Sequence, residues 1–237
     1  MLSLVGARRV VSILFPAPTR SFFDVAQHPG VRGYVALTFD DAFLRSSRAS
    51  DSMVEEVRRL LRKHNASATF FVTSSFVGNG AETSEIDEEI AALVRDGNEL
   101  GNHLPLDRPY HEDSRAEFES ELDKTARTIS RFHPATRWFR APHGRLSSTM
   151  STVLADRGLI NVMTDAYAND PHVPDPQYIA KTVLKAAQDG SIVLIHMPER
   201  HFRQWNIHAL QLILEGLSQR QLRAVTVSTL FDASSSA

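Results

Sequence analysis

Apolar residues recur along this chain with two different periods. Short apolar or alternating runs, which are typical of strands, lie at residues 34–39, 68–73, 99–102, 138–140, 161–164, 192–196 and 224–227. Between them, apolar positions three and four residues apart predict helices at 52–63, 86–95, 114–129, 147–157, 176–188 and 206–219. Strands that alternate with helices in this way predict an α/β fold with about seven parallel strands, a number that suits a closed or nearly closed barrel.

Ser114 and Glu117 mark the start of one of these helices. A serine followed three residues later by a glutamate is the sequence pattern of a capping box, in which each residue satisfies a free backbone N–H of the other. The apolar stripes on the predicted helices are interpreted as core and carry no functional argument.

Charged residues stand where several predicted strands end. Asp40 and Asp41 end the first strand, His103 follows the third, Arg140 ends the fourth and His196 ends the sixth. In α/β barrels the loops after the strands converge at one end, which is where the chemistry takes place. Two adjacent carboxylates repel each other, and a metal cation, a basic partner or a proton usually relieves that repulsion. The pattern predicts a functional site, and the alternative for the acidic pair is a helix N-cap.

His103 and Asp107 are four positions apart, so in a helical segment they would share one face and chelate one ion. Pro105 lies between them and favours a tight loop instead.

Composition indicates a single globular domain over residues 31–237. The chain has 237 residues, with 26 basic and 28 acidic side chains, and no charge excess that would indicate a nucleic-acid partner. The lack of cysteine excludes disulfides and thiolate metal ligands. No run approaches the roughly 18 apolar residues of a membrane span, so none is predicted.

Residues 1–30 allow two interpretations. Arg8, Arg9 and Arg20 occur with no acidic residue before Asp24, a composition compatible with a targeting peptide. Residues 10–15 also match a first strand. Cytoplasmic, organellar and secreted locations therefore all stay open, with the cytoplasm slightly favoured.

Five segments resemble, in order, the motifs of the polysaccharide deacetylase family, which includes chitin and peptidoglycan N-deacetylases. They lie at residues 38–41 (Thr-Phe-Asp-Asp), 68–72, 101–103, 139–144 (Phe-Arg-Ala-Pro-His-Gly) and 190–196. The resemblance covers residues 34–231, nearly the whole chain. It implies a distorted (β/α) barrel with fewer than eight strands, and removal of N-acetyl groups from N-acetylglucosamine-containing glycans.

The resemblance also implies a role for each catalytic residue. Asp40 would be the general base, and Arg140 would hold it ionised. His196 would be the general acid, oriented by Asp170 in the loop before its strand. Asp165 is the alternative partner for this histidine, and Pro171 departs from the tryptophan that the family usually has after the acid.

In the same way, the resemblance implies a divalent ion held by Asp41, His103 and Asp107. Zinc is the expected metal, with manganese, cobalt or nickel as alternatives. The family generally has a second histidine where this chain has Asp107, so His111 could substitute for it, or the metal could be weakly bound or absent. The backbone N–H of His143, a tyrosine in most of the family, would contribute to the oxyanion hole.

Two other functions remain open. One is an allantoinase-like C–N hydrolase that acts on a small amide with weak or no metal. The other is a non-catalytic carbohydrate-binding relative, against which the retained acids, arginine and histidine argue. The expected partner is a glycan or amide substrate, and the oligomeric state is open. Residues 197–205 form either a lid that faces the substrate or a solvated loop.

Overall fold

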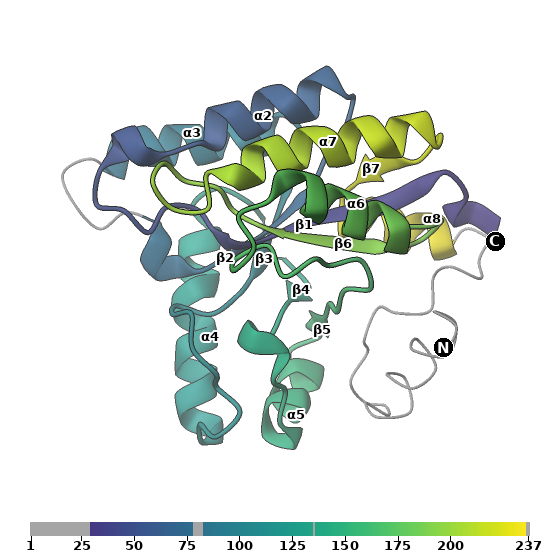
Figure 1. The fold of residues 1–237 in the computed structure, drawn as a ribbon. Coiled ribbons are helices and arrows are strands. Elements are labelled where there is room, and N and C mark those ends of the chain that lie inside the picture. The colour runs from purple at the N-terminus through teal and green to yellow at the C-terminus, as the bar shows by residue number, and fades with distance from the viewer. Residues whose placement is uncertain (1–28, 78–82, 135, 236–237) are drawn as a thin grey trace.

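The computed structural model describes residues 29–77, 83–134 and 136–235. Their strands form one parallel sheet with the order β5-β4-β3-β2-β1-β6, and β7 also pairs with β1 (Figure 1). The strands are β1 (Tyr34–Ala42), β2 (Thr69–Val72), β3 (Glu99–Asn102), β4 (Trp138–Phe139), β5 (Ile160–Asn161), β6 (Ile192–His196) and β7 (Arg223–Val225). The predicted α/β fold with about seven parallel strands is confirmed.

The sheet curls into an incompletely closed barrel. An isolated parallel bridge pairs Ala166 with Val193, and the Leu194 N–H donates to the Ala166 carbonyl at 3.0 Å. The segment after edge strand β5 therefore meets β6 at the other edge. This arrangement agrees with the predicted distorted barrel.

Helices pack around the sheet. They are α2 (Val54–Lys63), α3 (Thr83–Arg95), α4 (Arg115–Ile129), α5 (Ser148–Asp156), α6 (Pro176–Ala186), α7 (Trp205–Gln219) and α8 (Val227–Ser235), with 3-10 turns at Pro29–Val31, Ala49–Asp51, Ser74–Phe76 and Pro142–Gly144. In Figure 1, α2, α3 and α7 form a layer above the sheet, and α4 and α5 project below it. None of the helices within the described residues is long and apolar enough to cross a membrane.

The six predicted helices are present, with ends that differ by a few residues. The capping box at α4 is confirmed, since the Ser114 N–H donates to the Glu117 carboxylate at 2.8 Å and the Ser114 hydroxyl accepts from the Glu117 N–H. Helix α8 was not predicted. Residues 224–227 were expected to be a strand, but β7 ends at Val225 and α8 starts at Val227, because the Thr226 hydroxyl accepts from the Thr229 N–H and starts a helical turn.

Side chains alternate along β1, so every second one points into the barrel. Ala36, Thr38 and Asp40 share one face of the strand. Ala36 belongs to an interior cluster with Phe71 and Trp138, which fills the barrel below the site. The acidic residue at the end of the same row therefore lies at the mouth of the barrel.

The predicted alternatives for the N-terminus, a targeting peptide or a first strand, concern residues 1–28 almost entirely, and these lie outside the described residues. The described residues from 31 onward form one α/β unit.

Candidate active site

Strand register brings four of the predicted site residues together. Asp40 of β1 lies directly beside His196 of β6. His103 follows the β3 residue Asn102, whose carbonyl accepts from the Arg140 N–H at 3.0 Å. Because all these strands are parallel, their carboxyl ends meet at one edge, where α/β barrels place their active sites.

Asp40 and Arg140 form a buried ion pair. The Arg140 Nη1 donates to the Asp40 Oδ1 at 2.6 Å and to the Thr38 hydroxyl at 2.8 Å, while its Nε donates to the Val162 carbonyl at 2.9 Å. Burial by itself raises the pKa of Asp40, but the positive charge of Arg140, with smaller contributions from the site histidines, outweighs it and holds that pKa below its ordinary value. Asp40 is therefore a carboxylate held in one orientation.

His196 is held by Asp170, the partner that the sequence analysis favoured over Asp165. Its Nδ1 lies 3.1 Å from the Asp170 Oδ1, and its backbone N–H donates to Oδ2 at 2.9 Å. Asp165 instead accepts from the Ile192 N–H at 2.7 Å. A carboxylate only accepts hydrogen bonds, so Nδ1 carries a proton and Nε2 is left for the substrate. Burial lowers the pKa of His196, but the charge and hydrogen bond of Asp170, with smaller contributions from Asp40 and Asp41, together outweigh burial and raise that pKa.

Two residues at the start of α7 hold Asp170 in place, and neither was predicted from the sequence to do so. The Asn206 amide donates to the Asp170 Oδ2 at 2.5 Å, and the Trp205 indole N–H donates to the Asp170 carbonyl at 3.0 Å. The side chain of Asp170 is 1 % exposed. An asparagine in the first turn of a helix is a weak signal in sequence, because asparagine commonly serves as a cap.

His103 is fixed in one orientation by the backbone. Its Nδ1 lies 2.8 Å from the Arg140 carbonyl, which can only accept a hydrogen bond, so Nδ1 donates. Its Nε2 lies 3.8 Å from the Asp40 carboxylate and 3.9 Å from the Asp41 carboxylate. His103 is therefore between the two acids, with its second nitrogen facing both.

Asp41 is paired with an arginine that the sequence analysis did not identify. The Arg203 Nη1 donates to the Asp41 Oδ2 at 2.6 Å, and the two side chains are 8 % and 5 % exposed. Both residues have φ angles of 55°, in the left-handed region, which costs a non-glycine residue on the order of 1–3 kcal/mol. Such conformations persist where the surrounding structure enforces them, so this pair is built into the fold.

Asp107, the third predicted metal ligand, contacts His143. The His143 Nε2 is 3.1 Å from the Asp107 Oδ1, and both side chains are partly exposed at the rim of the site. His111, the alternative ligand, contacts Glu112 at 3.6 Å. Within the described residues no three histidine or acidic side chains form a group that could hold a metal ion.

These residues do not fit a divalent ion in the predicted way. One oxygen of Asp41 is occupied by the Arg203 guanidinium, and a metal on the other oxygen would lie beside that buried positive charge and be repelled by it. The third predicted ligand, Asp107, is engaged with His143. The structure therefore brings together an acid, a histidine and a second acid with two arginines, rather than an Asp-His-Asp ligand set.

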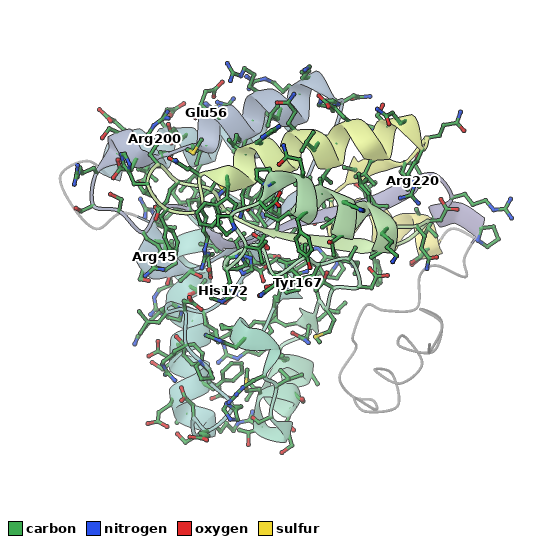
Figure 2. All side chains as sticks on the ribbon, in the orientation of Figure 1. Arg45, Glu56, Tyr167, His172, Arg200 and Arg220 are labelled. Carbon is green, nitrogen blue, oxygen red and sulfur yellow. The ribbon has the colours of Figure 1, made fainter. Side chains whose placement is uncertain are left out.

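The site opens into a cavity of about 410 Å³. The cavity is lined by the predicted residues Asp40, Asp41, His103, Asp107, Arg140, His143 and His196 together with Val162, Tyr167, His172 and Arg203. Tyr167 and His172 lie near the centre of the molecule in Figure 2, between the upper helices and α4 and α5. Burial, with a smaller contribution from Asp170, raises the pKa of Tyr167 to about 12, so its phenol stays protonated.

Of the aromatic residues that could stack on a sugar, Tyr167 is the one that lines this cavity. Trp138 is buried in the core, where its ring packs edge-on against Phe231 at 5.6 Å. Trp205 holds Asp170. Tyr167 therefore forms part of the cavity wall, while Trp205 supports the site through its hydrogen bond to Asp170.

The segment at residues 197–205 is an anchored turn, and its Arg203 lines the cavity. Glu199 and Phe202 exchange two backbone hydrogen bonds, at 3.0 and 3.1 Å, and the buried Glu199 carboxylate accepts from the Arg45 N–H at 2.8 Å. The turn is therefore anchored to the loop after β1. Its last residues deliver Arg203 to Asp41.

Solved structures share this fold. A peptidoglycan N-acetylglucosamine deacetylase superposes with a TM-score of 0.74 at 22 % identity over 86 % of this chain and 91 % of that one. An acetyl xylan esterase from Clostridium thermocellum, in complex with a cobalt ion, has a TM-score of 0.69 at 26 % identity over 84 % of this chain and 90 % of that one. A CE4 family pseudoenzyme from Bacillus anthracis has a TM-score of 0.72 at 23 % identity, covering 85 % and 66 %. The similarities below 25 % identity show the fold alone.

Sequence relatives include deacetylases, which are hydrolases acting on the C–N bond of an acetyl group. A chitooligosaccharide deacetylase of a Bradyrhizobium species is 30 % identical over 182 residues, which are 76 % of both chains. One from Sinorhizobium fredii is 28 % identical over 197 residues, covering 78 % of this chain and 86 % of the relative. An uncharacterized protein of Bacillus subtilis is 23 % identical over 192 residues, and the match spans 81 % of this chain and 57 % of that protein's length.

The family model for polysaccharide deacetylase matches residues 28–162, more than half of the chain. This match contains the acidic pair of β1, the residues after β3 and the arginine motif after β4. The family expected from the motifs is confirmed: the chain belongs to the polysaccharide deacetylase family.

Proposed function

We propose that this protein is a hydrolase that removes N-acetyl groups from N-acetylglucosamine-containing glycans, with Asp40 as general base and His196 as general acid. The single observation that carries this proposal is the pairing of Asp40 with His196. Asp40 and His196 are register neighbours at the mouth of one cavity, and their environments shift their pKa values in opposite directions. Two titratable groups arranged in this way are suited to acid and base roles in one reaction.

In this proposal, each proton transfer uses a separate atom. Arg140 occupies the Oδ1 of Asp40, so Oδ2 is the oxygen that takes a proton from water as the water oxygen bonds to the acetamide carbonyl carbon. Collapse of the tetrahedral intermediate breaks the C–N bond. The His196 Nε2 gives its proton to the leaving nitrogen, since Nδ1 is held by Asp170. The products are acetate and a free amine.

Stabilisation of the oxyanion is proposed to come from the turn after β4. His143 lies in this turn with a φ of 56° and lines the cavity. Its backbone N–H would donate to the carbonyl oxygen as negative charge develops there, an interaction that is typically worth a few kcal/mol in the transition state. The side chain is engaged with Asp107, so it is the backbone that this role requires.

No step of this mechanism is assigned to a metal ion. Zinc, or manganese, cobalt or nickel in its place, would need Asp41 as a ligand, and Arg203 already holds the Oδ2 of this carboxylate. The divalent ion expected from the family therefore competes with a residue of this chain.

The pairing of Asp41 with Arg203 also favours a second candidate, a C–N hydrolase that acts on a small amide. This alternative is the metal-poor one that the family resemblance left open. An assay for acetate release from chitooligosaccharides, run beside an assay for hydrolysis of small cyclic and linear amides, separates the two. Release of acetate supports the deacetylase, and hydrolysis of the small amides alone supports the alternative. A protein that binds chitooligosaccharides without hydrolysing either class would be a carbohydrate-binding relative.

His196→Ala should reduce deacetylation of glycans by about a hundredfold or more, the size of a general-acid contribution. Activated aryl acetates should lose far less activity, because their leaving groups have low pKa values and depart without a proton donor. The measurement is acetate release from both substrates by the same variant. Equal losses on the two substrates would show that the histidine is structural rather than the acid.

For kcat/KM, we expect a bell-shaped pH dependence. Activity requires Asp40 ionised and His196 protonated. The lowered pKa of Asp40 places the acidic limb below the ordinary range of aspartate, and the raised pKa of His196 places the alkaline limb above that of free imidazole.

Asp170→Asn tests this assignment, because it removes the negative charge that raises the pKa of His196. The alkaline limb should therefore move to lower pH, and an NMR titration of the His196 ring should show the same displacement. Asp165→Asn is the matched control, since Asp165 accepts from the Ile192 N–H and not from His196. An alkaline limb that stays in place in Asp170→Asn would disprove the pairing as the cause.

A further inference from the structure

Arg203 and Asp41 are 162 positions apart in sequence, and the fold joins them in a buried ion pair at 2.6 Å. Arg203 follows β6, while Asp41 belongs to β1 next to the proposed general base. The guanidinium is a permanent cation with a planar set of donors that matches a carboxylate. It therefore supplies positive charge at the same acidic residue where the family resemblance implies a metal ion.

Both ends of the Arg203 segment are anchored. On one side, Glu199 and Phe202 close a tight turn by two backbone hydrogen bonds, and Glu199 is tied to the loop after β1. On the other side, the Arg203 carbonyl accepts from the Asn206 N–H at 2.9 Å, in the first turn of α7. Asn206 also holds Asp170, so the segment that places Arg203 is continuous with the support of His196.

Hydrogen-bonding capacity remains on this guanidinium. The Nε of Arg203 is buried and has no hydrogen-bond partner among the described residues. Buried donors are nearly always paired, so this unpaired one is an exception beside the Asp41 ion pair. Arg203 lines the cavity together with Asp40 and His196.

We propose that Arg203 takes the place of the divalent metal ion at Asp41, so that this site keeps its charge balance without a tightly bound metal. The proposal deepens the proposed deacetylase function and rests on it. Removing one carboxylate oxygen and adding a fixed positive charge both oppose metal binding. The engagement of Asp107 with His143 removes the third predicted ligand as well.

The first test measures metal binding directly. The full chain is dialysed against a chelator and then titrated calorimetrically with Zn²⁺ and with Co²⁺, and the metal content is measured by mass spectrometry after desalting. We expect well under one ion per chain. Arg203→Ala should bind Zn²⁺ at least about tenfold more tightly than the unmodified protein, because Asp41 is freed as a ligand beside His103.

Two further variants separate charge from other effects. Arg203→Lys keeps the positive charge beside Asp41, so it should bind metal as poorly as the unmodified protein. Arg200→Ala removes an arginine from the same turn, one that is 46 % exposed and pairs with Glu56, and it should change nothing in the titration. Thermal unfolding of all variants shows whether each is folded. If Arg203→Ala does not fold, the test continues with Arg203→Lys.

Activity supplies the second test. Acetate release from chitooligosaccharides by the unmodified protein should be unaffected by excess EDTA, and Arg203→Ala should lose activity that added guanidinium ions partly restore. A merely structural arginine would not be rescued in this way.

The outcomes distinguish this proposal from the proposed function. One tightly held ion per chain in the unmodified protein, with loss of acetate release in EDTA, overturns the role of Arg203 and leaves the deacetylase standing. A metal-free protein whose Arg203→Ala variant gains Zn²⁺ but which releases no acetate supports Arg203 as the cation at Asp41 and overturns the deacetylase.

Discussion

Replacing Asp40 with asparagine should lower kcat/KM for acetate release by roughly 10²–10⁴-fold, the usual range for a general base. The amide has the shape of the carboxylate, so Arg140 can still donate to its oxygen and the fold should be retained. It cannot take a proton from water. The measurement is acetate release from chitooligosaccharides near neutral pH, together with a circular dichroism spectrum of the variant.

The matched control for this change is Asp96→Asn, which neutralises an acid that pairs with Arg58 and Arg62 on the helical layer, outside the cavity lining. We expect this control to keep full activity. An Asp40→Asn protein that kept most of its turnover would refute Asp40 as the base and would direct attention to Asp41.

Arg140→Ala should destabilise the protein by about 3–5 kcal/mol at neutral pH, the usual cost of leaving one partner of a buried ion pair uncompensated. Arg140 and Asp40 are 5 % and 8 % exposed, so water cannot take over the role of the guanidinium. The measurement is urea unfolding followed by circular dichroism.

The pH dependence of this loss has a definite sign. In the unmodified protein the pKa of Asp40 is lowered, so the ion pair contributes its full stability above the ordinary pKa of aspartate and loses it as pH falls through the folded-state pKa. The difference between the two proteins should therefore be largest near neutral pH and shrink as the solution becomes acidic.

Two control variants accompany Arg140→Ala. Arg140→Lys keeps the charge and should lose less, and Arg95→Ala removes an exposed ion pair with Glu88 and should cost at most about 1 kcal/mol. A loss in Arg140→Ala that was equally large at acidic pH would mean that packing, rather than charge, accounts for it.

Local sequence patterns were sufficient for most of the elements. The runs at residues 99–102 and 192–196 are strands with those bounds, and the capping box at Ser114 starts α4 as expected. Periodicity and capping act over a few residues, so they can be read without knowing what packs nearby. Helix α8 was missed because a short apolar run at a strand end does not by itself distinguish strand from helix.

The order of the motifs identified the family, and strand ends located Asp40, His103, Arg140 and His196 in advance, because parallel strands deliver their last residues to one edge. The choice of Asp170 over Asp165 for His196 was harder. Both acids lie in the same loop region, and hydrogen bonds to Ile192 and Asn206 decide which of them faces the histidine.

By itself, the sequence determined the fold class and the family and placed Asp40 and His196 at strand ends, since these depend on periodicity and on motifs in the order of the chain. What balances the charge of Asp41 was decided by the tertiary structure. The spacing of His103 and Asp107 indicated a shared ion, but Asp107 turns to His143 at the rim, and Arg203 comes from 162 positions away to hold Asp41. Ion pairs depend on distance in space rather than along the chain, and for buried charges the nearest available partner decides the chemistry.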